Sequence, residues 1–154
     1  MNNIQSITVV EDVTLISLQD SPADIGLISK IFEMISKAGI DVDMISQTPP
    51  HRNMPDLSFT VSGEDMVKVL EISAELRALN PDLKLSISNG HCKISVFGEE
   101  MRGCPGVACK VFNAIAKAKA DIGMITTSEV DISVLVAKAD LENTLEELHK
   151  AFSA

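Results

Sequence analysis

The sequence has 154 residues, of which 45% are hydrophobic and 23% charged, and its formal net charge is −9. This length fits one ordinary domain or two small ones. The negative charge disfavours binding to phosphate backbones and anionic membranes. Trp and Tyr are absent, so the aromatic faces on which single-stranded nucleic acids stack are scarce. We therefore expect neither a nucleic acid nor a membrane as a partner.

The N-terminal residues Met1 to Ile4 lack the basic stretch and apolar run of a signal peptide. No run of 18 apolar residues predicts a helix that crosses a membrane. The three cysteines, Cys92, Cys104 and Cys109, are odd in number and lack metal-ligand spacing. We therefore expect a protein of the reducing cytoplasm that holds no metal.

Apolar periodicity predicts eight strands and four helices along the chain. Residues 26–38 show the i, i+3, i+4 spacing of one buried helical stripe, and Gly39 supplies a stop. Short β-branched runs predict strands. The expected strands are 7–10, 13–18, 40–47, 57–61, 83–87, 92–97, 120–127 and 130–136. The other expected helices are 64–79, 106–118 and 141–152.

The chain also repeats itself. Residues 26–45 recur as residues 106–125, eighty positions later (106 − 26). The following hairpin recurs with a shorter offset, since Phe59 corresponds to Val134 (134 − 59 = 75), and the second copy lacks the proline-rich loop. A duplicated unit of this size indicates two similar modules packed together. A composite binding site is then more probable than a single catalytic centre.

Each copy follows the order βαββα, which favours an α+β fold of ferredoxin-like sandwiches with antiparallel sheets and helices on one face. The second copy lacks a last strand, whereas the N-terminal strand 7–10 is spare. We expect this strand to complete the second sheet and interlock the modules. The predicted boundaries are 11–90 for the first module, and 91–154 with the N-terminal strand 4–10 for the second.

Catalysis has little support in the sequence. None of the three histidines, His51, His91 and His149, has an obvious nucleophile or metal partner nearby in the chain. Neither a phosphate loop nor a dinucleotide fingerprint occurs. The loop 101–106 has two glycines ahead of a helix and could offer N–H groups to an anion. A tight strand-to-helix turn explains those glycines equally well.

The first copy offers a better constellation. Gly26 lets a ligand approach a helix start, where the N–H groups of Gly26, Leu27 and Ile28 suit a carboxylate. Asp24, Asp43 and Gln47 could accept hydrogen bonds from an ammonium group, and a free amino acid has both groups. Alternatively, Asp24 merely caps the helix and Asp43 is a solvated strand residue.

Four strings resemble the C-terminal regulatory region of aspartate kinases. They are residues 98–112 (GEEMRGCPGVACKVF), 125–133 (ITTSEVDIS), 40–47 (IDVDMISQ) and 57–61 (LSFTV). The resemblance covers nearly the whole chain. It implies two ACT modules of βαββαβ order that pair between chains as a homodimer. It also implies feedback inhibition by lysine, threonine or both, with the free amino acid bound at an interface between modules.

The resemblance assigns effector-binding roles to individual residues. Gly26 matches the glycine at the start of the effector-binding helix, and Leu27 and Ile28 match the residues after it. Asp43 and Gln47 match strand residues that face the ligand. Asp121 and Ile122 match positions of the second module that line the facing site. The string 20–26 (DSPADIG) departs from the usual Asp-x-Pro-Gly, so either Asp20 or Asp24 takes the acidic role.

The family's amino-kinase domain, which carries the ATP and aspartate sites, has no counterpart in this sequence. The chain is then an excised C-terminal part or a separately made regulatory subunit, and its partner is the catalytic domain or subunit of an aspartate kinase. We expect no phosphotransferase activity and no cofactor in this chain alone, with ATP and magnesium bound only by the kinase domain. The alternative is a stand-alone ACT-type dimerisation module with a vestigial ligand site.

Overall fold

The computed structural model describes residues 4–19, 25–48, 56–81 and 83–152. In this part of the chain six strands alternate with four α-helices. The strands are β1 (Ser6–Gln19), β2 (Val42–Gln47), β3 (Leu57–Ser62), β4 (Lys84–Phe97), β5 (Ile122–Thr127) and β6 (Asp131–Ala137). The helices are α1 (Ile25–Lys37), α2 (Met66–Leu79), α3 (Gly106–Lys117) and α4 (Leu141–Phe152). None of these helices is long and apolar enough to cross a membrane.

The chain divides into two compact units. The first module comprises Asp12–Asn89, and the second comprises the residues through Glu11 and those from Gly90 onward. The two long strands, β1 and β4, each extend through both modules, so that one part of each strand belongs to the first module and the other part to the second.

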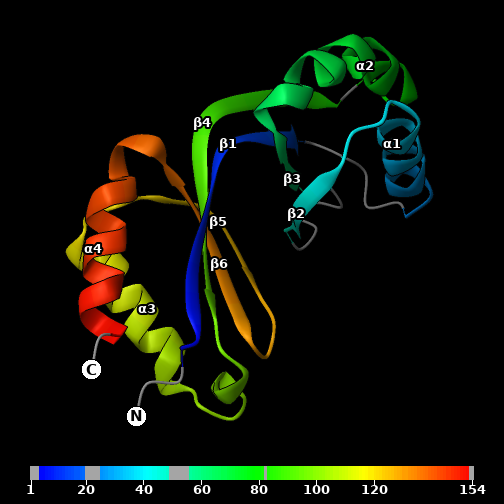
Figure 1. The fold of residues 1–154 in the computed structure, drawn as a ribbon. Coiled ribbons are helices and arrows are strands. Elements are labelled where there is room, and N and C mark those ends of the chain that lie inside the picture. Colours follow the sequence, from blue (N-terminus) through cyan, green and yellow to red (C-terminus); the bar gives the residue numbers. More distant parts are fainter. Residues whose placement is uncertain (1–3, 20–24, 49–55, 82, 153–154) are drawn as a thin grey trace. The chain divides into compact units, whose positions relative to one another are not determined.

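In the first module the strand order is β2-β3-β1-β4, and β3 runs antiparallel to both of its neighbours. Figure 1 shows α1 and α2 together in this module. Both helices bury apolar side chains in one core with the sheet, among them Ile31 and Ile35 of α1 and Val69 and Leu76 of α2. This is the ferredoxin-like module that the repeat predicted.

The second module has the strand order β1-β4-β6-β5, with β6 antiparallel to β4 and β5. Its helices α3 and α4 pack against each other and against this sheet (Figure 1). The N-terminal segment belongs to this sheet, because Ile4, Ile7 and Val9 pack on the core of the second module and the N–H of Gln5 donates to the carbonyl of Phe97 (2.8 Å). The interlocked topology is confirmed.

The sequence prediction divided two long strands into four short ones, and this was wrong. Residues 7–10 and 13–18 are one strand, β1, and residues 83–87 and 92–97 belong to one strand, β4. Each strand contains a residue in the left-handed region where the modules meet in sequence, Asp12 (φ 55°) and Gly90 (φ 74°). A single residue of this kind turns the backbone without ending the strand, so His91 lies within β4.

Candidate functional site

The start of α1 is the first part of the candidate site. Its first residue, Ile25, is 78% exposed, Gly26 is exposed, and the first turn contains no acidic residue. The N–H groups of a first helical turn find no partner within the helix, and the helix dipole places positive charge there. The first turn of α1 itself contributes no carboxylate, and the dipole at such a helix start favours a negatively charged group.

Strand β2 supplies the predicted polar partners, Asp43 and Gln47, which are both exposed. Gln47 pairs with Leu57, which in turn pairs with Leu18 of β1. Paired residues direct their side chains to the same face, and Leu57 and Leu18 lie in the core beneath the helices. Gln47 therefore lies on the helix-covered face, at the last row of the sheet.

That row lies at the end of the module where α1 begins. A tight turn follows α1, in which the N–H groups of Gly39 and Ile40 donate to the carbonyls of Ser36 (3.0 Å) and Ile35 (3.1 Å). The chain reverses there and enters β2, so α1 and β2 run in opposite directions. The end of β2 and the start of α1 are thus brought together, as the sequence analysis expected for Gln47.

Asp43 lies near the opposite end of β2, where a bulge between Val42 and Ile45 shifts the register. The hydroxyl of Thr60 accepts a hydrogen bond from the N–H of Met44 (3.0 Å) and fixes this bulge. Gln47 lies four positions after Asp43 (47 − 43), which corresponds to about 13 Å along a strand. One amino acid whose carboxylate caps α1 therefore does not reach Asp43 of the same module with its α-ammonium group.

The second module places Asp121 just before β5 and Ile122 as its first residue. Asp121 is exposed, whereas Ile122 is half-buried against the core and pairs with Val136. With the offset of eighty, Asp121 corresponds to Asp41, and Gly123 stands in the place of Asp43. The second module therefore has no carboxylate at the position of Asp43, a difference that the sequence analysis did not note.

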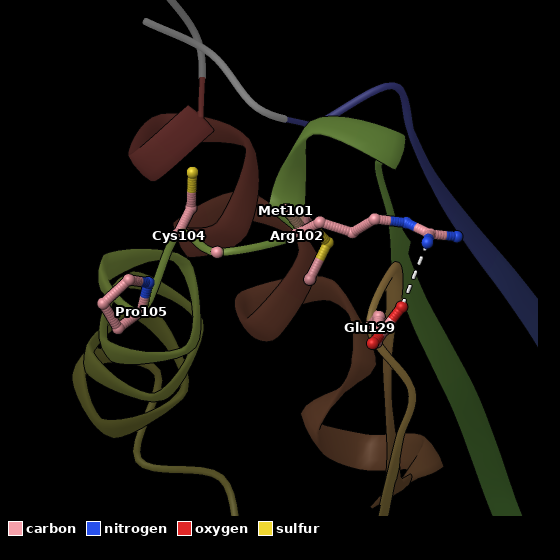
Figure 2. A pocket seen from close by; sticks show the side chains of 6 residues that line it. Met101, Arg102, Cys104, Pro105 and Glu129 are labelled. Carbon is pink, nitrogen blue, oxygen red and sulfur yellow. Dashed lines mark ion pairs between the residues drawn. The ribbon is translucent and has the colours of Figure 1, made fainter.

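The loop before α3 is the counterpart of the start of α1. This loop lines an open hollow of about 480 Å³. Figure 2 shows Arg102 reaching toward Glu129, and Arg102 Nη1 lies 3.1 Å from Glu129 Oε2. The N–H groups of Cys104 and Val107 donate to carbonyls of this same loop, Met101 (3.0 Å) and Cys104 (3.3 Å). The structure therefore favours the tight-turn interpretation of residues 101–106 over an anion-binding loop.

The two acidic candidates ahead of α1, Asp20 and Asp24, lie outside the described residues. Among the residues that the structure describes, no group of three or more His, Cys, Asp or Glu side chains is arranged to hold a metal ion. Gly26, Leu27, Ile28 and Gln47 are thus brought to one end of the first module, while Asp43 lies along β2 from them.

Comparison with known proteins identifies the family. The model of the ACT domain matches residues 94–152. An aspartokinase of Pseudomonas aeruginosa is 36% identical over 150 residues, which cover 97% of this chain and 36% of the relative. The crystal structure of the regulatory subunit of aspartate kinase from Thermus flavus superposes with a TM-score of 0.89 at 30% identity, covering 98% of this chain and 99% of that one. This chain belongs to the aspartate kinase regulatory family.

A second solved structure, of aspartokinase alpha and beta subunits, agrees with this assignment. It is 33% identical, has a TM-score of 0.87, and covers 98% of this chain and 99% of that one. The chain spans about a third of the length of the curated aspartokinases that it matches (36%). The two modules are therefore the ACT modules of an aspartate kinase regulatory region, as the sequence resemblance implied.

Proposed function

We propose that this chain binds free lysine or threonine and relays that binding to the catalytic domain or subunit of an aspartate kinase as feedback inhibition. The observation that carries the proposal is the exposed start of α1, whose first turn has no acidic side chain. Such a helix end stabilises a carboxylate. Gln47, on the same face and at the same end of the first module, offers an amide oxygen to the ammonium group.

The proposed site includes Asp43 through a second copy of the chain. Asp43 lies about 13 Å along β2 from Gln47, too far to share one α-amino acid with the helix start of its own module. The family resemblance implies a ligand at an interface between modules, which supports this arrangement. In a homodimer, Asp43 of one chain can meet the helix start of another, with Asp121 and Ile122 lining the facing side.

This arrangement makes two further demands on the protein. The chain should form a homodimer that buries at least roughly 1,000 Å² in total, which light scattering with and without amino acids measures. Binding should need no metal or other cofactor in this chain. We place the activity in the cytoplasm, where Cys92, Cys104 and Cys109, all free thiols in the structure, would stay reduced.

Calorimetric titration with lysine and with threonine tests the site. Asp43→Ala should weaken binding by about ten- to a hundredfold, because a charge-assisted hydrogen bond contributes roughly 1.5–3 kcal/mol. Asp41→Ala is the matched control, since Asp41 is an exposed carboxylate two residues earlier. It should leave the affinity within about twofold of the wild type. In the full enzyme, Asp43→Ala should relieve inhibition and spare uninhibited turnover.

Each outcome decides between the proposed function and its alternative. Equal affinities of the wild type and Asp43→Ala would remove Asp43 from the site. Equal losses in Asp43→Ala and Asp41→Ala would indicate a general effect of charge and not a contact. If neither amino acid produces heat with the wild type, the chain is a dimerisation module with a vestigial site.

A further inference from the structure

A second hollow lies between α3 and α4 of the second module, away from the helix starts. Its volume is about 300 Å³, at the lower end of the range for small-molecule sites. Its lining residues are Lys110, Asn113, Ala114, Lys117, Glu147, Lys150 and Ala151. Three of the 13 basic residues of an acidic chain thus gather at one hollow. We call it the α3–α4 groove.

The spacing of these residues makes the groove a continuous polar surface. Lys110, Asn113 and Lys117 follow one another at i, i+3 and i+7 on α3, so they share one face of the helix. The neighbouring Ala114 and Ala151 are small and leave room above the backbone. All three line the groove, and one N–H of the Asn113 amide is used within the helix, since Nδ2 donates to Cys109 Sγ at 3.5 Å.

The lysines of the groove differ in their partners. Lys110 Nζ lies 5.9 Å from the ring centroid of Phe152, which orients it toward α4. Lys150 Nζ lies 2.9 Å from Glu146 Oε1 and 3.5 Å from Glu147 Oε1. The hydrogen bond that Lys150 donates to Glu146, followed by the charges of Glu146 and Glu147, raises the pKa of Lys150. Within the described part of the chain, Lys117 forms no ion pair.

The first module has a carboxylate at a position where the groove has an amide. With the offset of eighty, Lys110 and Lys117 correspond to Lys30 and Lys37 of α1, and Asn113 corresponds to Glu33. In the first module Lys37 Nζ is held by Glu33 Oε1 at 3.2 Å. Asn113 cannot neutralise Lys117 in this way, since an amide carries no charge.

On the facing helix one acidic position becomes basic, although Glu147 stands where the first module has Ile72 (147 − 75 = 72). Lys150 of α4 corresponds to Glu75 of α2 with the hairpin offset of 75. Two acidic positions of the first module are therefore an amide and a lysine in the second. The carboxylates that face the groove from α4 are Glu147 in its lining and the adjacent Glu146, and both lie beside Lys150. Lys110 and Lys117 are left as the positive charges of α3.

We propose that the α3–α4 groove binds a small polyanion, a phosphate ester, pyrophosphate or a tricarboxylate, between Lys110, Asn113 and Lys117, with Lys150 opposite. Among the described residues that line the groove only Ala114 and Ala151 are apolar, and they give a nucleobase no surface to stack on. Binding therefore rests on charge-assisted hydrogen bonds from lysine and asparagine to a compact anion. The site is separate from the amino-acid site proposed at α1.

Titration of the full chain with inorganic pyrophosphate and with citrate, followed by NMR shifts of the α3 and α4 amides, tests this. We expect a dissociation constant below about 1 mM at low salt and weaker binding at high salt, because salt screens exposed charges. Binding of pyrophosphate alone would indicate a phosphate ligand, and binding of citrate alone a carboxylate ligand. Dissociation constants above about 1 mM at low salt for both anions would overturn the proposal.

Two variants localise the site. Asn113→Glu restores the side chain that the first module has, so it should pair with Lys117 and weaken binding at least about tenfold. Lys117→Gln should weaken it about three- to fivefold, as expected for one exposed charge. Lys37→Gln is the matched control on α1 and should change nothing. If Lys37→Gln weakens binding as much as Lys117→Gln, the anion binds non-specifically and the groove is not a site.

Discussion

The first and second modules arrange the same elements in the same order, yet their second helices, α2 and α4, fill the core with different side chains. With the offset of 75, Ser73 and Leu76 of α2 correspond to Leu148 and Ala151 of α4. In each helix the leucine of these two positions is the buried one, Leu76 in α2 and Leu148 in α4. The large and small side chains have exchanged places one turn apart, so a core needs total volume more than a particular residue at each position.

The sheets differ less than the helices. Serine hydroxyls face each other across neighbouring strands in both modules, Ser17 with Ser58 (3.2 Å) and Ser95 with Ser133 (2.9 Å). The edge strands β2 and β5 also carry a bulge at the same place. The duplicated sheets therefore define the common framework. Differences in charge occur around it, on β2 and β5 and on the outer faces of the helices.

Removing the first ten residues should give the largest difference in stability between the two modules. The truncation takes away Ile4, Ile7 and Val9, which pack on the second core, and it exposes the edge of β4. Loss of these contacts should lower the free energy of unfolding by at least about 3 kcal/mol, and the bare edge should promote aggregation. Urea unfolding and light scattering measure the two effects, and amide exchange should show greater loss of protection in α3 and α4 than in α1.

A milder pair of variants separates packing from truncation. Val9→Ala removes a side chain that contacts the core, whereas Val10 is 52% exposed. Val9→Ala should therefore cost about 1–2 kcal/mol, and Val10→Ala less than about 0.5 kcal/mol. Unchanged solubility and stability of the truncated chain would show that the N-terminal strand does not hold the second module together.

Two variants, Val69→Thr and Thr144→Val, test whether a buried hydroxyl has the same effect on stability in both cores. The residues correspond and both are buried, but the Thr144 hydroxyl donates to the carbonyl of Asp140 at 2.7 Å. Val69→Thr puts a hydroxyl into an apolar core and should cost about 1–2 kcal/mol. Thr144→Val removes a hydroxyl that bonds to Asp140, the residue just before its own helix, and should change stability by less than about 0.5 kcal/mol. Equal losses by urea unfolding would contradict this asymmetry.

Much of the fold followed from the sequence because the repeat and the helical periodicity are local signals. The continuity of β1 and β4 did not follow. Gly90 lies between the expected strands 83–87 and 92–97, where a glycine also fits a turn, and Asp12 has no property that predicts a positive φ within a strand. Asp tolerates the left-handed region better than most residues, but it is also common in ordinary turns. Only the pairing of both strand halves in the structure decides between these conformations.

The candidate site was predictable only in part. The glycine at the start of α1 and the matching strand residues could be found, because they lie in short motifs. The strand register that separates Asp43 from the start of α1 is a tertiary property and has no local signal. The α3–α4 groove was missed because its lysines come from helices more than thirty residues apart in sequence, Lys117 and Lys150 (150 − 117 = 33).

The helix ends offer the finest comparison between the modules. Both α1 and α3 end in the same turn, in which Gly39 and Lys119 donate to Ser36 (3.0 Å) and Ala116 (3.1 Å). Gly39 has a φ of 74° and Lys119 a φ of 56°. Glycine adopts this left-handed conformation without a steric cost, whereas a side chain adds roughly 1 kcal/mol.

Lys119→Gly should therefore stabilise the second module by about 0.5–1 kcal/mol, less than the full steric cost because glycine also loosens the unfolded chain. Gly39→Ala should destabilise the first module by about 1 kcal/mol. The cost there comes from the backbone alone, since an added Cβ would meet only Lys68 Nζ at an ordinary 3.8 Å. Urea unfolding of both variants gives the two values. A destabilised Lys119→Gly would mean that the lysine side chain contributes more to the end of α3 than its backbone strain costs.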